Sequence, residues 1–507
     1  MRLPSAWPIH AAYLALIALA LRGVGVCCDD FVEIVGRTAA SPVEDWQATP
    51  LLILTHGLAY KCIGYAHLWL YDVLKAAWVA AAYLAAFLFG RLYFPVERAA
   101  LFAALFVLYP SHDSTVFWFS NTYLTATAAL YLLAFWLAAR GRLFPAAAAA
   151  LAASFISYGS PPFALGFAFV FVLQRRLREA AALLAPNLLY AAYYVYVTRV
   201  LGVGSRRLPE QWNLLAMAKQ FALQVLGGAE AVLGPSLALK VWASIASLTV
   251  LSMLAALAIV AVLASAGRAA PASGRVPAAV WLGAVAIALL GFAMFALTGA
   301  YPQAAFGMVN RVTIYASFPV ALAIAAVPLP RPAYAAIAAV LVLATLGIGD
   351  HWRAWSRVQD ETIAAIRGNA ALRQVPAGSI VFVAGRAYSR LGPFAHIAFL
   401  ANRWTTEPVF ALALGGHAQF TTVPIGPWLR PTASGADDLR HGDSLRIGEW
   451  FTLYDAEHDQ LRTARREELA ALIERERLPR HWIQLIDAPE VRAWLLRWMP
   501  GLASVLS

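Results

Sequence analysis

Apolar segments of membrane-spanning length recur along the first 350 residues, and this recurrence limits the fold more than any other feature of the sequence. A helix needs about 20 apolar residues to cross the hydrocarbon core of a bilayer. By that measure the sequence predicts about eleven membrane-spanning helices, some of which extend into their flanks. The predicted spans lie near residues 8–26, 67–89, 98–112, 121–139, 143–158, 161–174, 180–199, 238–264, 276–298, 311–328 and 332–349.

The composition agrees with a membrane protein. Of the 507 residues, 61% are hydrophobic and only 13% are charged, whereas soluble domains contain about 25% charged residues. The net charge of +11 does not indicate nucleic-acid binding, because most basic residues lie between the apolar segments, where they orient helices. Cys27, Cys28 and Cys62 lack metal-ligand spacing, and free thiols are favoured over a disulfide between Cys62 and one of the other two.

The distribution of arginine predicts how the chain is oriented. Arg140 and Arg142, and then Arg175 and Arg176, lie in short connections, whereas the alternate short connections, around 109–121 and 157–162, contain no Lys or Arg. Cytoplasmic loops are enriched in basic residues. We therefore expect a membrane protein with a cytoplasmic N-terminus, and with Asp29, Asp30 and the C-terminal tail on the outer side.

The sequence changes character near Asp350, where charges become frequent and apolar runs shorten. The remaining length is sufficient for one globular domain. We predict a mainly α, polytopic membrane domain over residues 1–349 and a C-terminal soluble α/β domain over residues 350–507. Within the tail, the patterns predict helices over 357–373, 464–478 and 488–499 and a buried strand over 379–384.

Two adjacent aspartates, Asp29 and Asp30, follow directly on the first apolar segment. A carboxylate at the membrane surface can act as a general base toward an acceptor hydroxyl. The alternative is an N-cap for a short helix that continues through Phe31–Ile34. The pair alone does not decide between these interpretations, but its position at the outer mouth of the first helix favours catalysis.

The acidic pair, the loop that follows it to Ala66 and the many apolar spans together resemble the GT-C superfamily of integral-membrane glycosyltransferases. This superfamily includes protein O-mannosyltransferases, aminoarabinose transferases of lipid A, arabinosyltransferases and O-antigen glucosyltransferases. The resemblance covers about residues 1–350 and does not select a subfamily. It implies an inverting transferase in a bacterial inner membrane. At the outer face, such an enzyme moves a sugar from a polyprenyl-phosphate donor to a lipid-linked glycan, lipid A or a protein, with Asp29 or Asp30 as the base.

A donor of this kind carries a phosphate at the membrane surface, which arginine and lysine are suited to bind. Four basic residues lie on the predicted outer side and are candidates for this role: Arg206, Arg207, Lys219 and Arg311. For each of them the alternative is a cation exposed to solvent or lipid headgroups.

Further polar residues of the outer connections could contact the acceptor or line the site. These candidates are His56, His112, Asp113 and Asn310. A hard divalent cation would need several oxygen ligands, and Asp29, Asp30, His112 and Asp113 could supply some of the ligands only if folding brought them together. The sequence therefore favours a site without a metal ion, and no cofactor is assigned.

Three other functions compete with this interpretation. A glycan polymerase or ligase that uses a pyrophosphate-linked donor would rely on outer arginines and a histidine. A transporter or flippase of lipid-linked sugars would place polar groups near the midplane and show paired repeats, neither of which is clear here. A membrane-anchored binding protein would not need so many spans.

Overall fold

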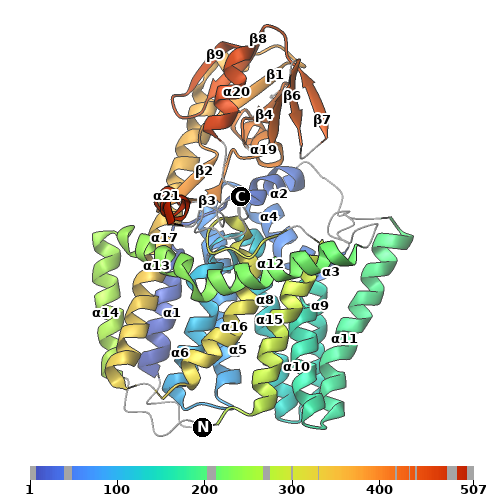
Figure 1. Cartoon of the computed structure of the whole chain (residues 1–507), viewed down its shortest axis with the longest axis vertical. Helices are drawn as coiled ribbons and strands as arrows, with labels where there is room; N and C mark the ends of the chain where they lie inside the picture. Colours follow the sequence, from blue (N-terminus) through green and yellow to red (C-terminus); the bar gives the residue numbers. More distant parts are fainter. Residues whose placement is uncertain are drawn as a thin grey trace.

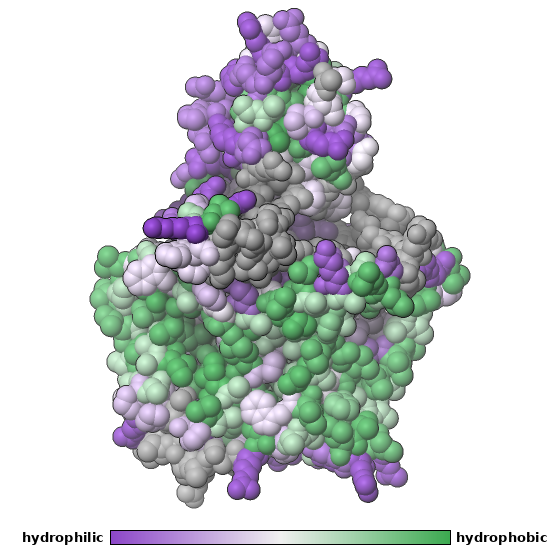
Figure 2. Space-filling view, viewed as in Figure 1, coloured by the Kyte–Doolittle hydropathy of each residue, from purple (hydrophilic) through white to green (hydrophobic). Residues whose placement is uncertain are grey.

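The chain folds into a bundle of apolar helices with a small mixed domain at one end (Figure 1). The computed structural model describes residues 7–38, 48–202, 213–266, 275–298, 301–328, 330–416, 419–426, 428–432, 434–439, 442–476 and 488–498. Figure 2 shows a broad apolar surface over the bundle and a hydrophilic surface over the small domain. We call the end of the bundle that meets the small domain the domain end.

The helices that run along the bundle are α1 (Trp7–Leu21), α5 (Leu68–Gly90), α6 (Val96–Val107), α8 (Thr122–Ala139), α9 (Leu143–Ile156), α10 (Pro161–Leu173), α11 (Leu177–Val195) with η5 (Tyr196–Val200), α14 (Val250–Ala266), α15 (Ala278–Thr298), α16 (Ile314–Ala326) and α17 (Arg331–Gly368) (Figure 1). Shorter helices and helical turns between them are α2 (Asp29–Thr38), α3 (Pro50–Leu52), η2 (Ile53–Gly57), α4 (Leu58–Ile63), η3 (Pro110–His112), α7 (Ser114–Phe117), η4 (Phe119–Asn121) and η6 (Met308–Thr313).

Membrane-length helices are present, but the predicted number of about eleven is not confirmed. Within the described residues, seven helical segments are long and apolar enough to cross a membrane. Other apolar helices, such as α1 and α9, are only 10–17 residues long. Several predicted spans are longer than the helices, because turns interrupt the apolar runs. The span predicted over 98–112, for example, contains the end of α6 at Val107 and the start of η3 at Pro110.

The predicted span at 238–264 is wrong, because the chain breaks there into α13 (Pro235–Ala246) and α14. The backbone N–H and the hydroxyl of Thr249 donate to Asp350 Oδ2 over 2.7 and 2.9 Å, which anchors the start of α14. α12 (Leu214–Leu233) and α13 lie across the bundle near the domain end (Figure 1). Leu215 and Trp242 are strongly exposed there, as expected for helices in a membrane interface.

α17 is a single helix of 38 residues that begins in the bundle and ends in the small domain (Figure 1). It continues without a break through Asp350, where the sequence suggested a domain boundary. Two glycines allow it to pack closely: a Cβ on Gly347 would lie 1.9 Å from Ser244 O of α13, and one on Gly349 would lie 2.5 Å from Ala20 O of α1. Small residues at helix contacts have this effect in membrane bundles.

The small domain confirms the predicted mixed architecture. Its elements are α18 (Ala370–Arg373), β1 (Ile380–Ala384), β2 (Tyr388–Leu391), β3 (Phe394–Ala398), α19 (Arg403–Ala413), β4 (Thr421–Pro424), β5 (Leu429–Thr432), β6 (Gly435–Asp438), β7 (Asp443–Arg446), β8 (Trp450–Asp455), β9 (Gln460–Arg465), α20 (Arg466–Arg475) and α21 (Pro489–Trp498). The predicted strand and the helices near 464–478 and 488–499 are therefore confirmed.

Strand β1 is central in the four-stranded sheet, whose order is β4-β1-β8-β9. It pairs in parallel with both neighbours, so that Val381 lies opposite Thr422 and Thr452. Its continuous apolar run is typical of a strand that is covered on both faces. A second, three-stranded sheet has the order β5-β6-β7, and β2 and β3 form a separate hairpin, which lies next to the bundle (Figure 1).

Candidate functional site

The turn between α1 and α2 delivers the acidic pair to the domain end of the bundle. Gly23 and Gly25 adopt φ angles of 74° and 63°, which favour glycine. Their backbone N–H groups donate to the carboxylate of Asp72 over 2.8 and 2.9 Å. Lys75 pairs with Asp72 at 3.0 Å and donates to Gly25 O. This buried ion pair on α5 fixes the path of the chain just before Asp29.

Asp30 is fully buried and its carboxylate is held by three donors. The backbone N–H of Cys27, the backbone N–H of Ser120 and the Tyr60 hydroxyl donate to it over 2.9, 2.9 and 2.5 Å. Burial raises the pKa of Asp30 to about 7, although the three hydrogen bonds act in the opposite direction. Asp30 therefore ties α2 to α4 and η4 and is enclosed by protein.

Asp29 differs from its neighbour because it is partly exposed. It lies close enough to Arg311 for the two opposite charges to interact. Arg311 comes from η6, far along the sequence, and is also partly exposed. The fold thus places one predicted base within electrostatic range of one predicted phosphate ligand.

Aromatic rings hold the guanidinium of Arg311. Its central carbon lies 4.5 Å from the ring centre of Tyr301 and 5.2 Å from that of Trp118. Tyr123 and Tyr158, whose hydroxyls are 3.1 Å apart, lie within electrostatic range. Across the part of the chain that the structure describes, no acceptor is hydrogen-bonded to Arg311.

We call Asp29, Arg311, Trp118, Tyr301, Tyr123 and Tyr158 the Arg311 site. A cation held by ring faces keeps its N–H groups directed elsewhere, and such N–H groups suit an anion. The three tyrosines of this site were not predicted from the sequence. Their positions next to apolar segments resemble those of ordinary interfacial aromatics, which hides a role in a site.

Asp113 lies in a second cluster and is almost completely buried. Its carboxylate accepts hydrogen bonds from Lys240 Nζ at 2.5 Å, Trp352 Nε1 at 2.8 Å, His396 Nε2 at 2.9 Å and the Asn310 amide. We call these five residues the Asp113 cluster. Burial opposes ionisation of Asp113, but the nearby Lys240 and His396 lower its pKa well below the usual range.

The Asp113 cluster changes the role expected for two candidates. Asp113 and Asn310 were predicted to contact an acceptor or to line the site. Each oxygen of the Asp113 carboxylate has two donors, which leaves it little capacity for a substrate. Asn310, directly before Arg311, is buried with its amide bound to Asp113.

Both candidate histidines are also buried. His112 is bonded to Phe106 O at 2.9 Å and to the Thr115 hydroxyl at 3.0 Å, and burial lowers its pKa to about 4. His56 lies between the hydroxyls of Thr55 and Thr122, each at 2.9 Å. These contacts occupy both nitrogens of each ring, so neither histidine is placed to contact a substrate.

Of the remaining candidates, only Lys219 is among the described residues, and no hydrogen bond or ion pair joins it to the Arg311 site. Lys219 is exposed on α12. Arg206 and Arg207 lie outside the described residues. In the described ranges, no three or more histidine, cysteine or acidic side chains form a group that could bind a metal ion.

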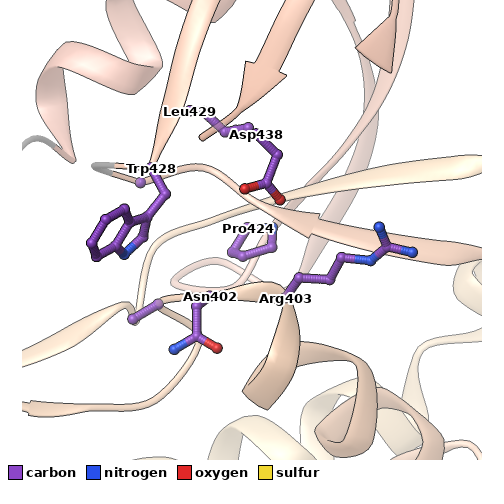
Figure 3. Close-up of a pocket in the computed structure, with 8 residues that line it drawn as sticks. Asn402, Arg403, Pro424, Trp428, Leu429 and Asp438 are labelled. Atoms are coloured by element: carbon purple, nitrogen blue, oxygen red, sulfur yellow. The ribbon is translucent and has the colours of Figure 1, made fainter. Parts of the chain in front are cut away.

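A small pocket in the C-terminal domain is lined by Asn402, Arg403, Pro424, Trp428 and Asp438 among others (Figure 3). Its cavity volume of about 10 Å³ is that of roughly one water molecule. Arg403 is bound to Glu407 and Asp443 at 2.7 and 2.9 Å. Its charge therefore stabilises the domain and is not directed at a ligand.

Comparison with known proteins adds no further assignment. No protein-family model, no curated protein and no solved structure matches this chain.

Proposed function

We propose that this chain is a membrane glycosyltransferase of the GT-C type, which moves a sugar from a polyprenyl-phosphate donor to an acceptor at the membrane surface. The observation that carries the proposal is the Arg311 site. There a partly exposed carboxylate lies within electrostatic range of a partly exposed guanidinium that no described residue hydrogen-bonds. A general base and an anion ligand are the two groups that such a transfer needs from the protein.

In the proposed reaction, the acceptor oxygen attacks the anomeric carbon of the donor sugar. The new glycosidic C–O bond forms as the bond between that carbon and the phosphate oxygen breaks, and the electron pair leaves with the phosphate. Asp29 takes the proton of the acceptor hydroxyl. Arg311 binds the phosphate, which gains negative charge as the sugar departs. A single displacement of this kind inverts the anomeric configuration.

The proposal assigns different roles to the two aspartates. Asp29 is the base because it is partly exposed and near Arg311. Asp30 is a structural residue because it is buried and bound by three donors. The aromatic rings of the Arg311 site offer faces against which a sugar or an isoprenoid chain can pack.

We further propose that the domain end faces the outside of a bacterial inner membrane. This arrangement supposes that the short apolar helices cross the bilayer together with the long ones, giving about eleven crossings. Arg140 and Arg175 then lie at the cytoplasmic end, where basic residues are favoured. Cys62 is exposed near the domain end, so a membrane-impermeant thiol reagent should label it in intact cells.

The decisive experiment compares Asp29→Asn with Asp30→Asn. Each variant is incubated in membranes with a panel of polyprenyl-phosphate-linked hexoses and pentoses, and release of the polyprenyl phosphate is measured. We expect Asp29→Asn to lose about 100-fold or more in turnover, which is the contribution of a positioned general base. Its unfolding temperature should stay at the wild-type value.

Asp30→Asn serves as the matched control. It should change stability more than Asp29→Asn does and should retain more activity. Equal turnover in Asp29→Asn and the wild type would refute the role of Asp29. Labelling of Cys62 only after the cells are permeabilised would place the site in the cytoplasm, where a flipped donor is absent.

A further inference from the structure

Segment 305–313 connects the Asp113 cluster to the Arg311 site. Asn310 binds Asp113, and the next residue is Arg311. The side-chain oxygen of Asn310 also accepts from the backbone N–H of Ser114 at 3.2 Å, and Thr313 donates to Ser111 O at 2.7 Å. η6 is therefore fixed on both sides of Arg311 to the segment that contains Asp113.

His396 links this arrangement to the C-terminal domain. It lies on β3 and is 1% exposed. Its Nδ1 accepts from the backbone N–H of Gly307 at 3.1 Å, so the proton of the neutral ring lies on Nε2, which donates to Asp113 at 2.9 Å. Burial lowers the pKa of His396 and favours this neutral form. One imidazole thus bridges Asp113 and the start of η6.

The hairpin around His396 also packs on the same segment. The ring centres of Phe394 and Phe306 lie 4.6 Å apart. Lys240 donates to Ala305 O and to Asp113, so the backbone just before η6 is held from the bundle as well. The β2–β3 hairpin and the bundle therefore enclose the segment that carries Arg311.

We propose that the C-terminal domain completes the Arg311 site, with His396 as a positioning residue that holds η6 and thereby aims the guanidinium of Arg311. The domain is then part of the binding machinery for the anion and not a separate module. This inference rests on the proposed function in one respect, which is that Arg311 binds the phosphate of the donor.

The test uses the full-length protein in detergent and two probes, farnesyl phosphate and farnesol. Because farnesol lacks the phosphate, the difference between the two Kd values measures the contribution of the phosphate to binding. We expect His396→Ala to weaken binding of farnesyl phosphate by about 10-fold, because small displacements of a positioning group reduce binding and rate strongly. Farnesol binding should be unchanged.

A double variant separates positioning from simple loss of stability. If His396 acts through Arg311, then His396→Ala combined with Arg311→Ala should bind farnesyl phosphate no more weakly than Arg311→Ala alone, since residues that act together are not additive. Leu453→Ala, in the separate core of the C-terminal domain, is the matched control. It should lower the unfolding temperature and leave the Kd for farnesyl phosphate unchanged.

Conservative variants refine the test. In His396→Gln, the side-chain amide lies near the former position of Nε2 and can still donate to Asp113. In His396→Asn, the side-chain amide lies near the former position of Nδ1 and can still accept from the backbone N–H of Gly307. We expect partial recovery in both His396→Gln and His396→Asn. If His396→Ala does not fold, these two variants carry the same measurement.

The outcomes are distinguishable. If Arg311→Ala weakens farnesyl phosphate binding and none of the folded His396 variants does, the positioning role is refuted and the proposed function stands. If Arg311→Ala has no effect, the phosphate is bound elsewhere and the assignment of Arg311 fails. Additive losses in the double variant would also overturn the proposal.

Discussion

The Arg311 site and the Asp113 cluster adjoin at Asn310 and Arg311 but use charge in opposite ways. In the Asp113 cluster, a buried carboxylate is matched by four donors from four elements. In the Arg311 site, a partly exposed guanidinium is held by ring faces. The difference suggests that the cluster provides rigidity, since its hydrogen-bonding capacity is used, whereas the site keeps capacity for an anion.

Two of the buried carboxylates, Asp30 and Asp113, sharpen this comparison. Both are enclosed, yet the pKa of Asp30 is raised to about 7 by burial, whereas that of Asp113 is lowered. The difference comes from Lys240, which is paired with Asp113 at 2.5 Å. Asp30 is held by neutral donors only. A directly paired cation therefore decides which buried carboxylate remains charged.

The largest effect is expected from Asp113→Asn, which leaves the charge of Lys240 buried and unpaired. Breaking a buried ion pair on one side costs about 3–5 kcal/mol. We expect a large fall in the unfolding temperature in detergent, measured by intrinsic fluorescence. Asp437→Asn, which removes the exposed ion pair with Arg430, should change stability by less than about 1 kcal/mol. Similar unfolding temperatures for the two variants would contradict a structural role of the cluster.

A smaller, pH-dependent effect is expected from Asp30. Its folded pKa of about 7 lies above the ordinary value of about 3.9. Its contribution to stability is therefore full below about pH 4 and is lost as the pH rises through about 7. The stability of the wild type relative to Asp30→Asn should fall over this window by a few kcal/mol at most. Unfolding temperatures of both proteins from pH 4 to 8 test this, and a constant difference would contradict it.

The smallest change in stability, but a clear change in binding, is expected from Arg311→Ala. A charge-assisted contact to phosphate contributes about 1.5–3 kcal/mol, so affinity for a polyprenyl phosphate should fall by about 10- to 150-fold. Arg311→Lys should recover only part of this loss if two guanidinium N–H groups bind the phosphate. Lys219→Ala is the control and should bind like the wild type, because Lys219 is exposed on α12. If Arg311→Ala and Lys219→Ala lost equal affinity for the polyprenyl phosphate, its binding would reflect the overall positive charge of the protein and not a defined site at Arg311.

Local patterns predicted much of the fold. Apolar runs gave helices such as α5 and α8 nearly to the residue, and the run between Gly378 and Gly385 gave strand β1. The break between α13 and α14 was missed because it depends on Asp350, about a hundred residues later in the chain. No helix was predicted over α12, because polar residues such as Lys219 and Gln224 interrupt its apolar run.

The candidate site was predictable in part. Asp29 and Arg311 were identified from their positions next to apolar segments. The sequence could not rank Asp29 against Asp30, because burial of Asp30 depends on Tyr60 and Ser120. It also could not show that Asp113 is enclosed, because its partners Trp352 and His396 are 239 and 283 residues away.

Because α17 is continuous, its length fixes the rotation of the C-terminal domain relative to the helix bundle. At about 1.5 Å per residue, its 38 residues form a rod of about 57 Å. Each residue added to or removed from this rod beyond Trp352 would turn the C-terminal domain by about 100° and shift it along the axis. His396 could then no longer meet Asp113. A whole added turn would nearly restore the rotation but would still shift the domain by about 5.4 Å, so His396 meets Asp113 only at the present length of α17. The exposed loops of the same domain are free of this restriction.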